Sequence, residues 1–143
     1  MRIVKLQPTP HGVHPHTGLF AMSDPILSLD PSLLTRVGDV VGFDYTDRFG
    51  HEAEGFVVRT PEGVRAWRNA CPHWDIPMDP DDLWDEDTQQ IVCPFHGACF
   101  EPDEGLCTSG PPEGARLDPL GLKVDPQTGR IEVFLQVGLS FGF

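Results

Sequence analysis

Two short segments, each with one cysteine and one histidine, constrain this chain more than any other feature of its sequence. In "ACPHW", Cys71 and His73 have a C-x-H spacing, and in "VCPFHGACF", Cys93 and His96 have a C-x-x-H spacing. Nineteen residues separate His73 from Cys93. A proline directly follows each cysteine and stiffens the backbone there. Neither pair can close a four-coordinate metal site alone, whereas the two pairs together can.

Two sulfur and two imidazole ligands fit either a structural zinc ion or an iron-sulfur centre, because both accept tetrahedral ligation by sulfur and nitrogen. Composition does not separate these two metals. Each segment follows a stretch with a strand pattern, so we expect two loops at the tips of hairpins, facing one another.

The whole pattern, C-x-H followed by C-x-x-H-G, "ACF" and the loop "SGPPEG", resembles that of Rieske ferredoxins, and this resemblance favours iron-sulfur over zinc. It implies an all-β Rieske fold, with antiparallel sheets in a sandwich and a cluster-binding loop subdomain at one end. It also implies a Rieske-type 2Fe-2S cluster, with Cys71 and Cys93 on the inner iron and His73 and His96 on the outer iron. A proline loop at residues 110–112 would cover that cluster.

The chain has 143 residues, enough for one domain with a hydrophobic core. Its 15 glycines and 15 prolines indicate many turns between short elements, which favours an all-β fold. The resemblance spans residues 39–137, the predicted Rieske domain. Residues 1–38 are predicted to be an N-terminal extension packed on that domain, and residues 138–143 a C-terminal tail.

The strand and turn patterns give further expectations. Strands are predicted for "DVVGFDY", "EGFVVRT", "VRAWRNA", "LGLKV" and "RIEVFLQV", with turns at "PEG" and "DPQTG". In the extension, "DPSLLTRVG" predicts one short helix, capped by Asp30, started by Pro31 and stopped by Gly38.

The chain is strongly acidic, with 22 aspartates and glutamates against 10 lysines and arginines and a formal charge of -12. This balance argues against nucleic acid and anionic membranes as ligands, and it favours a basic protein partner or serves solubility alone. No apolar stretch suggests a signal peptide or a membrane span, so we expect a soluble cytoplasmic protein. In that compartment cysteines are metal ligands or thiols, and Cys99 and Cys107 are expected to be buried thiols in strand and turn.

Two further motifs allow two interpretations each. The acidic segment "DPDDLWDED", residues 79–87, is either a docking rim for a basic redox partner or a solvated loop. His11, His14 and His16 have spacings that could hold a second metal, but no thiolate or carboxylate lies near them in sequence, which favours an ordinary loop.

The resemblance implies a soluble one-electron carrier without catalytic residues, which takes electrons from a flavoprotein reductase and passes them to a terminal oxygenase or another redox acceptor. One alternative is a small Rieske subunit of a larger oxidoreductase, and another is a zinc-stabilised interaction domain. An oxygenase would need a further domain with a 2-His-1-carboxylate iron site, for which the chain has no room.

The resemblance also implies a low redox potential. High-potential Rieske proteins have a serine two residues and a tyrosine four residues after the second ligand histidine, and their hydroxyls donate hydrogen bonds that stabilise the reduced cluster. Here those positions hold Ala98 and Phe100, which cannot donate. We therefore expect a potential near the lower end of the Rieske range of about -150 to +300 mV.

Overall fold

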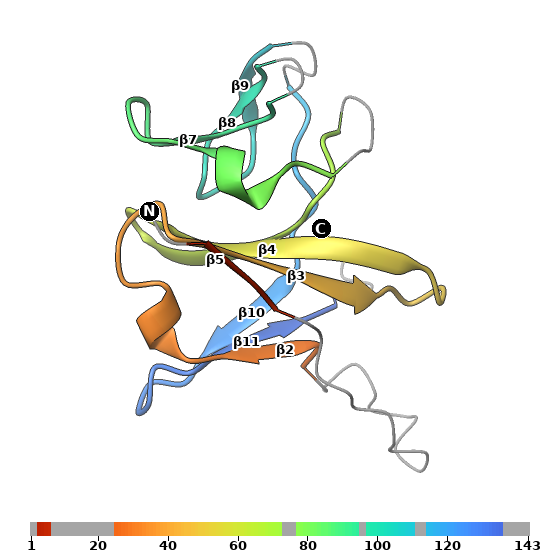
Figure 1. Ribbon diagram of the computed structural model, residues 1–143, viewed down its shortest axis with the longest axis vertical. Coiled ribbons are helices and arrows are strands. Elements are labelled where there is room, and N and C mark those ends of the chain that lie inside the picture. Colours follow the sequence, from red (N-terminus) through yellow and green to blue (C-terminus); the bar gives the residue numbers. More distant parts are fainter. Residues whose placement is uncertain (1–2, 7–24, 73–76, 95–96, 111–113, 136–143) are drawn as a thin grey trace.

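The structure is a computed structural model that describes residues 3–6, 25–72, 77–94, 97–110 and 114–135. The described part consists of strands, loops and two single-turn 3-10 helices, which confirms the all-β prediction. Three sheets lie one above another, as Figure 1 shows. No helix in the described part is long and apolar enough to cross a membrane. The predicted histidine cluster of the N-terminal extension and the C-terminal tail lie outside the described residues.

The middle layer is a four-stranded sheet in the order β1-β3-β4-β5. Its strands β3 (Val40–Thr46), β4 (Glu52–Thr60) and β5 (Gly63–Arg68) pair antiparallel, and all three were predicted from the sequence. β1 (Ile3–Leu6) adds to this sheet by pairing parallel with β3. Part of the N-terminal segment is therefore a strand of the central sheet, which the sequence pattern did not indicate.

The lower layer in Figure 1 is an antiparallel sheet in the order β10-β11-β2. β10 (Gly121–Val124) and β11 (Ile131–Phe134) form the predicted closing pair. β2 (Leu27–Leu29) pairs with β11, so a second piece of the N-terminal segment also joins a sheet.

The upper layer is a small antiparallel sheet in the order β6-β7-β8-β9. Its strands are β6 (Trp84–Asp85), β7 (Gln90–Val92), β8 (Cys99–Phe100) and β9 (Cys107–Ser109). β6 and β7 lie between the two predicted ligand segments along the chain, and β8 and β9 follow the second segment. We call residues 69–115 the upper subdomain.

The central sheet is buried on both faces, which explains why its strands have nearly continuous apolar runs. Val40 belongs to the core shared with the upper subdomain, whereas its neighbour Val41 belongs to the core shared with the lower sheet. On β4, Phe56 and Val57 divide between the two cores in the same way. The upper core therefore rests directly on the central sheet.

The predicted helix is present only as η2 (Pro31–Leu33). Its start is confirmed, because the Asp30 carboxylate accepts the Ser32 N–H at 2.9 Å, and this bond lowers the pKa of Asp30. The prediction that it continues to Gly38 is wrong, because η2 ends at Leu33. The buried Asp39 carboxylate accepts two backbone N–H groups just after η2 and holds a turn there. Gly38 has φ +99° in that turn.

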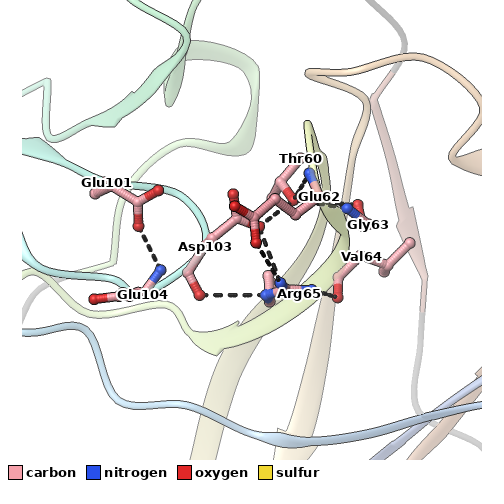
Figure 2. Close-up of polar contacts among 8 residues, drawn as sticks. All are labelled: Thr60, Glu62, Gly63, Val64, Arg65, Glu101, Asp103 and Glu104. Carbon is pink, nitrogen blue, oxygen red and sulfur yellow. Dashed lines mark hydrogen bonds and ion pairs between the residues drawn. The ribbon is translucent and has the colours of Figure 1, made fainter.

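A polar contact fastens the upper subdomain to the edge of the central sheet, as shown in Figure 2. The Asp103 carboxylate, in the loop between β8 and β9, accepts the hydroxyl hydrogen of buried Thr60 at the end of β4. The Arg65 guanidinium on β5 lies 3.2 Å from the same carboxylate and donates to the Asp103 carbonyl at 3.2 Å. We refer to Thr60, Arg65 and Asp103 as the strut.

Candidate metal centre

The first ligand segment leaves the central sheet at the end of β5. Cys71 is 1% exposed there. His73 lies outside the described residues, and the description resumes at Pro77. The two ends of the segment are joined by Asn69, whose side-chain amide forms two hydrogen bonds with the backbone of Met78. The described ends of the segment are thus held together, and its first ligand, Cys71, is packed in the upper core.

The second ligand segment begins directly after β7. Cys93 is 0% exposed, and its N–H donates to the Ala98 carbonyl at 2.8 Å. The Gly97 N–H donates to the Cys93 carbonyl, also at 2.8 Å, so the chain reverses tightly between these residues. Gly97 has φ +73°, a backbone conformation that favours glycine, which explains the glycine of C-x-x-H-G. His96 lies outside the described residues.

The predicted proline loop begins against the second ligand segment. Gly110 has φ +100°, and a Cβ at this position would lie 2.6 Å from the Ala98 Cα. Only glycine permits so close an approach. Pro111 and Pro112 lie outside the described residues, so the loop that would cover the cluster stays a prediction.

The two ligand segments start from different sheets, yet both cysteines lie in the same core. Cys71 and Cys93 pack there with Met78, Ala98 and Phe100, all nearly inaccessible to water. Two buried thiols at the starts of two short loops fit the thiolate half of a Rieske cluster or of a zinc site with two cysteines and two histidines. Within the described residues no three cysteine, histidine, aspartate or glutamate side chains form a metal site.

The other two cysteines lie in the upper sheet. Cys107 is buried in β9, as expected, although in a strand and not a turn, and its Sγ donates to the Ser109 carbonyl at 3.2 Å. Cys99 in β8 is only half-buried, so the expectation of two buried thiols is wrong for Cys99. Its side chain lies on the face of β8 opposite the buried Phe100, as strand alternation requires.

Negative charge is concentrated in the upper subdomain. Between Arg68 and Arg116 the sequence has eleven acidic residues and no lysine or arginine, so this segment carries -11 of the net charge of -12. The rest of the chain has eleven acidic and ten basic residues and is almost neutral. Exposed acidic residues on the described part of the segment are Asp79, Asp82, Glu86, Asp87 and Glu104.

Sequence reasoning missed Asn69 and the strut. Asn69 was part of the predicted strand "VRAWRNA", and nothing in the sequence connects it with the backbone nine residues later. Asp103 and Thr60 are 43 residues apart, and each taken alone is an ordinary loop or strand-end residue.

Several solved structures are similar to this one. The ferredoxin of carbazole 1,9a-dioxygenase from Nocardioides aromaticivorans IC177 has 24% identity over 79% of this chain and 99% of that chain, with a TM-score of 0.60. A chain from the complex of reduced oxygenase and oxidised ferredoxin in carbazole 1,9a-dioxygenase has 24% identity over 75% and 99%, with a TM-score of 0.55. A protein described as an NADH-dependent nitrite reductase small subunit from Mycobacterium tuberculosis has 18% identity over 75% and 93%, with a TM-score of 0.51.

No curated protein sequence matched the chain. The family model for the Rieske [2Fe-2S] domain matches residues 34–131, more than half of the chain. This match decides between the zinc and iron-sulfur interpretations that the ligand types left open. The chain therefore belongs to the Rieske [2Fe-2S] domain family, and its cofactor is a Rieske-type 2Fe-2S cluster.

Proposed function

We propose that the protein is a soluble, cytoplasmic one-electron carrier of the Rieske ferredoxin type. Cys71 and Cys93 would bind the inner iron, and His73 and His96 the outer iron. The observation that carries this proposal is the burial of both cysteines in one core, at the starts of two loops from different sheets, within the part of the chain that matches the family.

The ligand set accounts for the chemistry of such a carrier. The bound cluster supplies one site that accepts and releases a single electron. Two neutral imidazoles in place of two thiolates make the oxidised site less negative, so that adding an electron is easier than in a plant-type ferredoxin. The chain excludes water from the cysteine side through the packed upper core, and the histidines would lie on the side nearer a docking partner.

We propose a flavoprotein reductase as the electron donor and a terminal oxygenase as the acceptor. The similarity to the dioxygenase ferredoxin over almost its whole length supports an oxygenase acceptor. The charge of -11 on the upper subdomain supports a basic docking face on the partner, since complementary charge steers association. The segment 79–87 would form part of this acidic surface.

An electron-transfer assay tests this function. NADH and a flavoprotein ferredoxin reductase should reduce the purified protein by one electron per chain, followed as bleaching of its visible absorption. Mixing the reduced protein with a Rieske terminal oxygenase should restore the colour. Two results would contradict the carrier function. One is reduction by the reductase that is too slow to support repeated turnover, and the other is a reduced cluster that the oxygenase does not re-oxidise.

A small subunit of a larger oxidoreductase is a second candidate, favoured by the similarity to the nitrite reductase small subunit. Such a subunit would stay bound to its large partner during gel filtration of a cell extract. A carrier would instead elute alone and exchange between partners.

A further inference from the structure

The side chain of Asn69 closes the first ligand loop at its base. Its Nδ2 donates to the Met78 carbonyl at 2.8 Å, and its Oδ1 accepts the Met78 N–H at 2.8 Å. One amide thus satisfies both backbone groups of a residue nine positions further on, as a neighbouring β-strand would do. Asn69 is 4% exposed and Met78 is 1% exposed, so water does not compete for these bonds.

This closure is anchored to the central sheet. The backbone N–H of Asn69 donates to the Glu54 carbonyl on β4 at 2.8 Å. The Met78 side chain packs in the upper core with Cys71 and Cys93. The two ends of the loop at residues 70–77 are therefore held at one point, between the central sheet and the core that contains both cysteines.

Only an amide of this length can make both bonds. An aspartate at position 69 would accept the Met78 N–H but would place a negative charge against the Met78 carbonyl. A leucine of similar size would leave both buried backbone groups without a partner, which is costly because water cannot replace the lost bonds.

We propose that Asn69 is a positioning residue for the iron-sulfur cluster. By joining the two described ends of the first ligand segment, it fixes the backbone from which Cys71 reaches the inner iron. The inference rests on the proposed ligand set. It makes Asn69 responsible for how firmly the inner iron is held and for how uniform the cluster geometry is, in addition to any contribution to folding.

The experiment compares Asn69→Asp and Asn69→Leu with a control that weakens the fold elsewhere. Val133→Ala removes buried volume from the lower core, on the far side of the central sheet from both cysteines. For each cluster-loaded protein, the melting temperature, the rate of iron release to a chelator and the width of the EPR lines would be measured.

Asn69→Leu should release iron about tenfold faster than wild type or more, since two buried hydrogen bonds are lost. Asn69→Asp should show a smaller acceleration, because it keeps one bond. Both variants should give broadened EPR lines. Val133→Ala should lower the melting temperature while leaving the EPR lines and the rate of iron release unchanged at a temperature equally far below its melting point.

The proposal is overturned if the Asn69 variants release iron no faster than Val133→Ala at such matched temperatures and keep sharp EPR lines. If Asn69→Leu does not fold, the same comparison with Asn69→Asp decides the matter. A wild-type protein without a Rieske EPR signal would overturn the ligand set itself. A normal wild-type signal combined with control-like Asn69 variants would overturn only the positioning role.

Discussion

Replacing Ala98 by serine and Phe100 by tyrosine should raise the midpoint potential of the cluster by about 100 mV, which corresponds to about 2.3 kcal/mol for one electron. Both positions follow the second ligand segment, and both side chains are 0% exposed. By resemblance to high-potential Rieske proteins, hydroxyls here donate to the cluster and to a cysteine sulfur. Such donors stabilise the reduced, more negative state.

The magnitude follows from the burial of these two positions. A hydrogen bond to a charged group contributes about 1.5–3 kcal/mol, and only part of this differs between the oxidised and reduced clusters. Two bonds shielded from water therefore give a shift near 100 mV, since 59 mV corresponds to a tenfold change for one electron.

The assay is a redox titration followed by EPR, with Ala66→Ser as the control. Ala66 is buried in the lower core, so its variant gains a buried hydroxyl away from both cysteines and should keep the wild-type potential. The wild-type potential should lie near the lower end of the Rieske range. A wild-type value above about +200 mV would refute the reasoning, as would a double variant that keeps its cluster and shows no shift.

Two further predictions concern the strut and the acidic surface. Asp103→Ala should lower the melting temperature of the loaded protein by several degrees, because it removes the carboxylate that accepts from buried Thr60 and pairs with Arg65, whereas Glu62→Ala, at an exposed ion pair, should change it little. Electron transfer from the reductase should slow as salt rises, since exposed charges are screened beyond about 8 Å at physiological ionic strength. Neutralising four residues together should flatten this salt dependence: Asp81, Asp82, Asp85 and Glu86. Equal melting temperatures for both strut variants, or rates indifferent to salt, would contradict these expectations.

The longer strands could be predicted because they show their pattern within the sequence. β3, β4 and β5 are six to nine residues long and are separated by recognisable turns. The strands of the upper sheet have only two or three residues, too few to show a period of two. β1 and β2 could not be predicted, because what makes them strands is pairing with β3 and β11, far along the chain.

The candidate centre likewise has a part that the sequence predicts and a part that it does not. The cysteines could be chosen because ligand spacing is a local property of the sequence, and their burial agrees with that choice. The bonds of Asn69 and Asp103 could not be found, because each depends on a backbone or side chain that folding brings near. The prediction that the helix ends at Gly38 was wrong, because the Asp39 carboxylate accepts the N–H groups of Thr35 and Arg36 and ends the helix earlier.

Iron and sulfide analysis combined with EPR of the wild type and of His96→Ala tests the proposed centre most directly. The wild type should contain two irons and two labile sulfides per chain, and it should give a rhombic Rieske signal after reduction. His96→Ala should lose that signal. His51→Ala, at an exposed histidine remote in sequence from the ligand segments, should keep it. An unchanged spectrum in His96→Ala, or a wild-type protein without the signal, would contradict the proposed ligand set.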